Sequence, residues 1–341
     1  MSATPNPAIA PSPEVIFETL QAYQRSAALR AAIELDLFRF IGKGPQDAAS
    51  LAKSCSASER GIRILCDFLT TIGLLLKEDG RYRHSPASAV FLDPNSPACI
   101  ASISRFIGTP AMQQPYAHLA DIVRKGGTIL PGEGTVEPDN PIWVDFAHSM
   151  APMVGPATAP LASLVLEGTS GPLRVLDIAA GHGLFGIAVA KQAPQAHITA
   201  VDWAAVLEVA KANAQKARVA DRYETRPGSA FTADFGGPYD IVLLTNFLHH
   251  FDPPTCTQLL KKVRGSCKPG ARVAALEFVP NPDRISPPIA AAFSLTMLAG
   301  TPAGDAYTFS ELETMYTDAG FTHITQHPIP MSPETAVIGR A

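Results

Sequence analysis

The sequence predicts a mainly helical N-terminal region followed by an α/β region with a mostly parallel sheet. After residue 171, apolar strand-like runs alternate with helical segments, which is typical of parallel sheets with right-handed crossovers. A glycine-rich turn joins the first of these runs to a helix. Before residue 85, helices are followed by two short strands around a glycine turn, the outline of a winged helix.

Composition excludes several classes of protein. The 341 residues carry a formal net charge of −4, whereas proteins that mainly bind nucleic acid are normally basic. The five cysteines form no CxxC pair and no cysteine–histidine cluster, so we expect neither a disulfide framework nor a metal site. No signal peptide is recognisable, and no apolar stretch reaches the roughly 20 residues that cross a bilayer. We therefore expect a cytoplasmic protein that binds neither nucleic acid nor a membrane.

The N-terminal region is expected to be a winged-helix-like domain over residues 14–110, after a disordered lead at 1–13 that is rich in alanine and proline. Its helices and short strands are expected at 14–40, 47–53, 58–71, 74–77 and 81–84. The charged residues of the 58–71 helix sum to zero. A DNA-reading helix needs several net positive charges, so this domain is expected to serve packing or dimerisation.

Residues 111–170 are expected to form a helical connector that prolines interrupt, among them Pro115, Pro152, Pro156 and Pro160. The domain at 171–341 is expected to hold the site. Its parallel strands are expected at 174–179, 197–201, 223–226, 240–245 and 272–278, and an antiparallel pair at 321–326 and 335–339.

The glycine-rich turn contains the pattern GxGxxG, formed by Gly181, Gly183 and Gly186, and Asp202 ends the next strand. Glycines allow close backbone approach to a cofactor, and an acid at the second strand can bind ribose hydroxyls. Enzymes that use NAD and enzymes that use adenosylmethionine share this pattern. Asp177 beside the turn favours a cationic ligand, because a carboxylate there would repel a pyrophosphate. The alternative is that Asp177 only forms hydrogen bonds within the loop.

From about Phe17 to Ile338 the chain resembles the class I S-adenosylmethionine-dependent small-molecule O-methyltransferases that carry an N-terminal winged-helix dimerisation domain. The segments that carry the resemblance are Val175–Gly183, Val201–Asp202, Leu243–Asp252 and Lys268–Pro280. The resemblance implies a Rossmann-like sheet with an antiparallel C-terminal strand, S-adenosyl-L-methionine as cofactor, and a homodimer.

The resemblance also implies the residues that bind the cofactor. These are Asp177, Gly181, Gly183, Asp202, Trp203, Ser229, Ala230, Phe231, Thr245 and Asn246. Trp203 would pack on adenine, although ordinary packing at a helix start explains it nearly as well. Ser229 stands where the family usually has an acid, so its contact with adenine depends on a hydroxyl.

His249 matches the catalytic base of the family, since an imidazole can take the proton of a hydroxyl during methyl transfer. Glu277 matches a carboxylate that orients this base. His250 replaces the Asp that usually follows the base, and it is assigned to the substrate. A second family carboxylate falls at Ala306, next to Asp305. The alternative for the two histidines is that they only pack or cap the loop.

Apolar residues at helical spacing are expected to form the wall of the substrate site. They are Phe146, Met150 and Met153 of the connector, and Phe293 and Met297 of a helix at 289–298. Such stripes are also common in protein cores. Methionine adapts to flat and varied aromatic molecules.

These observations predict an O-methyltransferase that acts on a hydroxyl of a small phenolic or polyketide-like molecule. Three alternatives stay open at this point. They are a C- or N-methyltransferase on the same scaffold, an NAD-dependent oxidoreductase, and a winged-helix regulator that binds adenosylmethionine without turnover.

Overall fold

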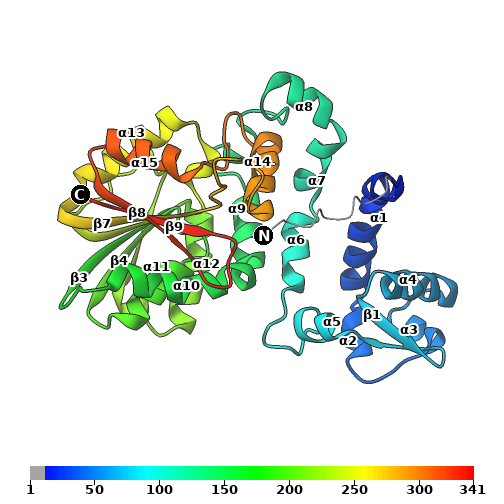
Figure 1. Cartoon of the computed structure of the whole chain (residues 1–341). Helices are drawn as coiled ribbons and strands as arrows, with labels where there is room; N and C mark the ends of the chain where they lie inside the picture. Colours follow the sequence, from blue (N-terminus) through cyan, green and yellow to red (C-terminus); the bar gives the residue numbers. More distant parts are fainter. Residues whose placement is uncertain (1–11) are drawn as a thin grey trace, which may run out of the picture. The chain divides into compact units, whose positions relative to one another are not determined.

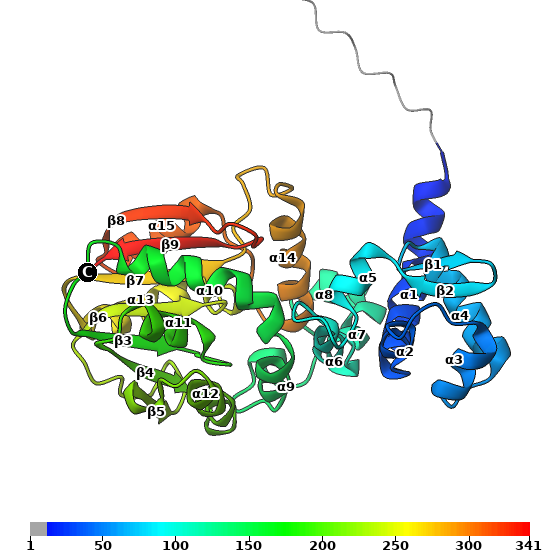
Figure 2. The same cartoon turned by 90° about the horizontal axis from the view of Figure 1, so that it is seen from below.

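The computed structural model describes residues 12–341, which divide into two compact units between Ser104 and Arg105 (Figures 1 and 2). Of the predicted disordered lead at 1–13, residues 1–11 lie outside the described residues. The predicted connector at 111–170 belongs to the second unit and is not a separate body.

The first unit has the helices and the strand pair that the sequence predicts. Its elements are α1 (Glu14–Glu34), α2 (Leu37–Ile41), α3 (Ala48–Ser54), α4 (Glu59–Thr71), β1 (Leu75–Glu78), β2 (Arg81–His84), α5 (Pro86–Phe91) and the 3-10 turn η1 (Ala101–Ile103). The side chains of Asp47 and Ser58 cap α3 and α4 by accepting hydrogen bonds from backbone N–H groups. The strands β1 and β2 are antiparallel. This is the arrangement expected of a mainly helical winged-helix-like unit.

The helix α4 packs through one face and pairs its charges on the other. Ile62, Cys66 and Leu69 recur at spacings of four and three residues and are buried. Asp67 accepts hydrogen bonds from Arg63 at 3.0 Å and from Lys77 at 2.6 Å. The basic groups nearest to this acid are therefore already paired within the unit.

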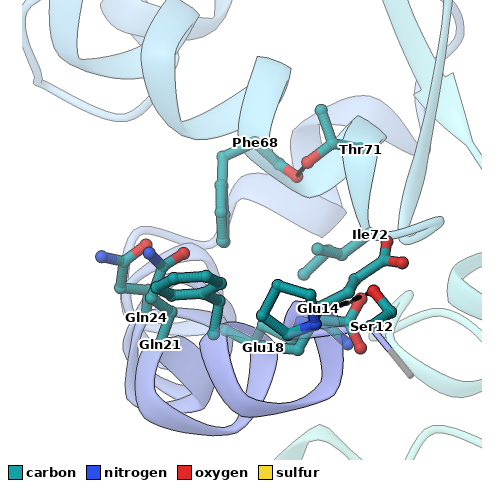
Figure 3. Close-up of a pocket in the computed structure, with 11 residues that line it drawn as sticks. Ser12, Glu14, Glu18, Gln21, Gln24, Phe68, Thr71 and Ile72 are labelled. Carbon is teal, nitrogen blue, oxygen red and sulfur yellow. Dashed lines mark hydrogen bonds and ion pairs between the residues drawn. The ribbon is translucent and has the colours of Figure 1, made fainter.

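A surface groove of about 470 Å³ lies between α1 and α4 (Figure 3). Phe68 and Ile72 point into it from α4. Beside it, α1 exposes a series of large apolar side chains whose exposed fractions are between 59% and 69%: Val15, Ile16, Phe17, Leu20 and Tyr23. A long helix that leaves this much apolar surface in water is typical of an interaction surface.

Short helices precede the sheet of the second unit. They are α6 (Ser104–Ile107), α7 (Pro110–Ala117), α8 (Leu119–Lys125), the 3-10 turn η2 (Gly134–Val136), α9 (Ile142–Ser149) and α10 (Ala151–Leu166). The prediction that prolines interrupt this region is wrong at three of them. Pro115 lies inside α7, and Pro156 and Pro160 lie inside α10. Each costs one helical hydrogen bond, and in α10 the burial of residues such as Leu161 and Val165 offsets that loss.

A bend of 68° between α9 and α10 separates residues that the sequence analysis placed on one helical face. Met150 ends α9, and Pro152 lies in the first turn of α10, where a missing N–H is tolerated. Among residues 12–341, no single helix is long and apolar enough to cross a membrane; only α9 and α10 taken together meet that test of length and composition.

A seven-stranded sheet in the order β5-β4-β3-β6-β7-β9-β8 forms the centre of the second unit. Its strands are β3 (Leu173–Ile178), β4 (Ala196–Asp202), β5 (Tyr223–Pro227), β6 (Tyr239–Thr245), β7 (Cys267–Glu277), β8 (Thr322–Pro328) and β9 (Thr335–Arg340). All neighbouring pairs from β5 to β7 are parallel, whereas β9 is antiparallel to both β7 and β8. The predicted fold class, with its antiparallel C-terminal strand, is confirmed.

Helices cover both faces of this sheet (Figure 1). One face packs against α10, α11 (Leu184–Gln192) and α12 (Ala204–Lys216), and the other packs against α13 (Pro253–Gly265) and α15 (Phe309–Asp318). The 3-10 turn η3 (Ala220–Arg222) leads into β5, η4 (Leu248–His250) follows β6, and α14 (Pro288–Gly300) follows β7. Because both faces are buried, the inner strands are mainly apolar in their middle parts, and polar residues stand toward their ends, with Asp202, Thr245 and Glu277 at carboxyl ends.

Candidate active site

The loop between β3 and α11 has the backbone that its glycines predict. Gly181 and Gly183 adopt φ values of +56° and +74°, a region that residues with a side chain rarely occupy. A Cβ atom on Gly183 would lie 2.5 Å from the Tyr223 hydroxyl and 2.9 Å from the Ala210 Cβ. A Cβ on Gly181 would meet only the Ala179 carbonyl, at 4.0 Å. The loop is therefore tightly packed beneath Gly183 and open at Gly181.

Asp177 lies beneath this loop and does not line its surface. The side chain has an exposed fraction of 0%, and Oδ2 accepts a hydrogen bond from the Gly186 N–H at 3.1 Å. Oδ1 has no hydrogen-bond partner among residues 12–341. Burial, reinforced by the charge of Asp202, raises the pKa of Asp177 to about 8. The structure thus favours the alternative in which Asp177 holds the loop over direct contact with a ligand.

Asp202, at the end of β4, joins the loop to the start of α12. Its Oδ2 accepts from the Gly181 N–H at 2.8 Å, and its Oδ1 accepts from the Trp203 N–H at 2.7 Å. Burial raises the pKa of Asp202 to about 6, although these two hydrogen bonds lower it. Trp203 packs with Val206 and with residues of α9, as the packing alternative expects, and remains partly exposed.

The segment after β5 forms a turn that Lys262 holds. The Lys262 ammonium donates to the carbonyls of Ala230 and Ala233, at 3.0 and 2.6 Å. The Ser229 hydroxyl accepts from the Phe231 N–H at 3.2 Å, so the serine that replaces the family's acid stabilises the turn itself. Phe231 is 37% exposed, which leaves this aromatic ring available at the surface.

His249 and Glu277 form a buried pair at the carboxyl ends of β6 and β7. Their exposed fractions are 4% and 2%. Glu277 Oε2 accepts a hydrogen bond from His249 Nδ1, and Oε1 accepts from the N–H groups of Phe247 and Leu248 at 3.1 and 2.8 Å. Glu277 therefore fixes both the imidazole and the backbone that carries it. With the Nδ1 proton facing a carboxylate, Nε2 is left as the proton acceptor of the ring.

His250 is also buried, with 7% exposed, and its Nδ1 has no hydrogen-bond partner in the described part of the chain. Its ring lies 4.3 Å from the His249 ring and 5.1 Å from the Trp143 ring, between centroids. Burial and the neighbouring His249 place the pKa of His250 well below its ordinary value. His250 is therefore neutral near pH 7 and can accept or donate one hydrogen bond.

The predicted substrate residues fall into three places. On α14, Phe293 contacts the His249 ring edge to face at 4.8 Å, and Met297 is buried on the same helix. On α9, Phe146 stacks on His182 at 6.4 Å. Met153 lies beyond the bend, with 44% exposed. A wall that joins Phe146, Met150 and Met153 on one helical face is therefore wrong, because the helix breaks at Met150.

A second carboxylate near His249 comes from a place that the sequence does not indicate. Asp305 forms an ion pair with Arg284 at 3.3 Å, and Ala306 is fully buried among apolar residues. Glu334, the residue before β9, is 5% exposed and interacts electrostatically with both Glu277 and His249. A lone acid in a proline- and serine-containing loop gives no pattern that could have identified it.

The loop residues fit a cationic nucleoside cofactor. Gly181 is open where a Cβ would lie, and its N–H donates to the Asp202 carboxylate, so a ligand that approaches this backbone has an acid nearby. Burial raises the pKa of Asp202, and a positively charged ligand would stabilise the ionised form of this carboxylate. Among residues 12–341, no group of three or more His, Cys, Asp or Glu side chains could hold a metal ion.

Comparisons with known proteins agree with this arrangement. Residues 161–322 match the model of the O-methyltransferase domain, and residues 17–94 match that of the O-methyltransferase dimerisation domain. Acetylserotonin O-methyltransferase of Mus musculus is 29% identical over 327 residues, which cover 91% of this chain and 84% of that protein. The tetracenomycin polyketide synthesis 8-O-methyl transferase of Streptomyces glaucescens is 26% identical over 332 residues, 96% of each chain.

Solved structures show the same fold. A Nostoc punctiforme protein assigned as an O-methyltransferase is 49% identical, with a TM-score of 0.95 over 97% of this chain and 100% of that one. Human N-acetylserotonin methyltransferase in complex with SAM is 23% identical, with a TM-score of 0.83 over 100% and 99% of the two chains. The resemblance seen in the sequence is confirmed: the chain belongs to the family of S-adenosylmethionine-dependent small-molecule O-methyltransferases.

Proposed function

We propose that this enzyme methylates a hydroxyl of a small phenolic or polyketide-like molecule, with His249 as the general base. The observation that carries the proposal is the buried His249–Glu277 pair, in which the carboxylate binds Nδ1 and two backbone N–H groups at once. The names of relatives support the substrate class, since they include a polyketide 8-O-methyl transferase and a 3-hydroxy-5-methyl-1-naphthoate 3-O-methyltransferase.

In this proposal the chain supplies orientation and proton transfer. Bound S-adenosylmethionine supplies an electrophilic methyl group on a sulfonium. Gly181 and Asp202 would hold the nucleoside part, with Trp203 and Phe231 as flat surfaces near it. His249 Nε2 accepts the proton of the acceptor hydroxyl as its oxygen attacks, and Glu277 stabilises the imidazolium that forms. Much of the rate arises from alignment of the two substrates.

The acceptor would lie between α14 and α9. Phe293 stands against the base itself, and Met297 lies one helical turn further along α14. His250 faces Trp143 of α9, and its Nδ1 has no partner among residues 12–341, so it can bind a polar group of the acceptor. Mass and fragmentation of the product formed with a labelled cofactor would distinguish oxygen from carbon or nitrogen as the methylated atom.

The test of the base is His249→Ala. We expect kcat to fall by roughly 10²–10⁴-fold while calorimetry shows an unchanged dissociation constant for S-adenosylmethionine, because His249 acts on the acceptor and not on the cofactor. His148→Ala, on an exposed position of α9, is the control and should leave both quantities unchanged. Unaltered turnover by His249→Ala would show that alignment alone drives the reaction.

We also propose that the homodimer forms through α1. The matched dimerisation domain covers residues 17–94, and within it α1 exposes Phe17, Leu20 and Tyr23 beside the groove against α4 (Figure 3). Covering these side chains with a second copy would remove their apolar surface from water.

A further inference from the structure

Glu334 is a buried acid that neither the sequence patterns nor the family resemblance assigns. It immediately precedes β9, whose first residue, Thr335, is paired with Glu277 of β7. Its exposed fraction is 5%, although an unpaired carboxylate is costly to bury. A buried carboxylate of this kind is normally stabilised by hydrogen bonds or by a nearby positive charge, or is retained for a function.

The contacts of Glu334 connect it to the loop that carries the base. Oε2 accepts a hydrogen bond from the Ser332 hydroxyl at 2.8 Å, and the Glu334 N–H donates to the same hydroxyl at 3.2 Å. The side chain of Asn246 also forms a hydrogen bond with the carboxylate. Asn246 has a φ of +54°, a left-handed conformation that asparagine adopts more readily than most residues, and its N–H donates to the Leu276 carbonyl at 2.8 Å.

We propose that Glu334 is a positioning residue of the methyl-transfer site, which holds Asn246 at the start of the His249 loop and supplies a second negative charge behind the His249–Glu277 pair. The inference rests on the proposed role of His249 as the base. It adds a residue from a different strand that stabilises the protonated form of that base.

Electrostatics within the site support this role. Burial and the charge of Glu277 raise the pKa of Glu334, whereas hydrogen bonding by Ser332 and Asn246 and the charge of His249 lower it. Such coupling is mutual: a protonated His249 favours an ionised Glu334, and an ionised Glu334 favours a protonated His249. Glu334 therefore responds to the charge that forms on the imidazole when it takes up a proton.

Three other titratable groups near the His249–Glu277 pair, Cys256, Tyr316 and His250, are neutral near pH 7. Burial, together with the charge of Glu277, raises the pKa of Cys256 and of Tyr316, and burial lowers the pKa of His250. Of these five groups, Glu277 and Glu334 are the ones that can carry a negative charge to balance the imidazolium.

The decisive variant is Glu334→Gln, which removes the charge and keeps an oxygen that can accept hydrogen bonds from Ser332 and Asn246. We expect the acidic limb of the kcat/KM profile, where His249 becomes protonated, to move toward lower pH by about half a unit or more. KM for both substrates should stay within about twofold. Glu334→Asp, which keeps the charge, should restore most of the profile. A purely structural role would change stability and leave the position of the limb unaltered.

Glu313→Gln is the matched control, since it makes the same change on an exposed position of α15 and should not move the limb. A second measurement does not depend on turnover: the titration of His249 followed by NMR on histidine-labelled protein, with the resonance assigned from the spectrum of His249→Ala. If Glu334→Gln folds poorly, Ser332→Ala gives the same test, with a smaller shift in the same direction.

The outcomes separate the two proposals. An NMR titration and a rate profile that are both unmoved in Glu334→Gln overturn the role of Glu334, whatever His249→Ala does. Full activity of His249→Ala overturns the general base, and the NMR titration then still decides whether Glu334 sets the proton affinity of His249.

Discussion

Two glycines of the cofactor loop allow backbone strain to be separated from crowding. Both Gly181 and Gly183 have left-handed φ values, but only Gly183 is packed against other residues. Gly181→Ala should therefore cost only the left-handed conformation, about 1–2 kcal/mol of unfolding free energy. Gly183→Ala carries the same cost and adds the conflict with Tyr223 at 2.5 Å and Ala210 at 2.9 Å. Overpacking of this kind typically costs about 1–3 kcal/mol, so we expect about 2–5 kcal/mol in total.

Urea unfolding followed by tryptophan fluorescence measures this difference well. The two tryptophans, Trp143 and Trp203, both lie in the second unit, so the signal reports on the unit that contains the loop. Gly265→Ala is the control, because a Cβ there meets nothing within 4 Å and the residue lies at the end of α13. Equal destabilisation by Gly181→Ala and Gly183→Ala would refute the argument from crowding, and calorimetry would show whether Gly183→Ala also weakens cofactor binding.

Two further predictions concern stability and assembly. Because the pKa values of Asp177 and Asp202 are about 8 and about 6 in the folded chain, above the ordinary 3.8, the unfolded chain releases these protons first. The unfolding free energy of the protein without cofactor should then fall as pH rises from about 4 to about 8. Asp177→Asn should reduce the part of this decrease that occurs between about pH 6 and about pH 8. Urea midpoints that are equal at pH about 5 and about 8 would contradict the prediction. Leu20→Glu should convert the homodimer to monomer in light scattering, since two buried leucines per dimer contribute about 3–6 kcal/mol. Val123→Glu, at another exposed apolar position, on α8, is the control and should leave the dimer intact. A dimer that survives Leu20→Glu would place the interface elsewhere.

The sequence predicts the sheet well because its strands are buried on both faces. The strand Leu173–Ile178, for example, is mostly apolar and follows Pro172, so its position can be recognised from the sequence alone. The start of α13 follows equally from local chemistry: Asp252 accepts a hydrogen bond from the Thr255 N–H at 2.9 Å, and Pro253 occupies the first helical position. The juxtaposition of His249 and Glu277 then follows from two neighbouring parallel strands ending at one edge.

What could not be predicted depends on contacts between distant segments. Met153 is separated from Phe146 because the chain bends at Met150. The spacing of apolar residues cannot show this bend, because Pro152 fits a continuous helical pattern as well as the first turn of a new helix. Asp177 lies beneath its loop because it accepts a hydrogen bond from the Gly186 N–H. This bond depends on how the start of α11 packs over the end of β3, which the sequence does not show. Glu334 lies next to the residue that pairs with Glu277 because β9 pairs with β7 across about 57 residues of intervening chain, and loop closure of that length leaves no local signal.

The position of β9 in the sheet also sets the order in which the strands can pair during synthesis. Since β9 lies between β7 and β8, the strand β8 has no neighbour in the sheet until residues 335–340 have emerged from the ribosome. The strands that carry the cofactor loop, β3 to β6, are complete about 90 residues earlier in translation and can pair with one another. The four strands around the glycine-rich loop have thus been synthesised before β9 can join β7 to β8, so the sheet is completed by inserting a strand between two strands that were made earlier.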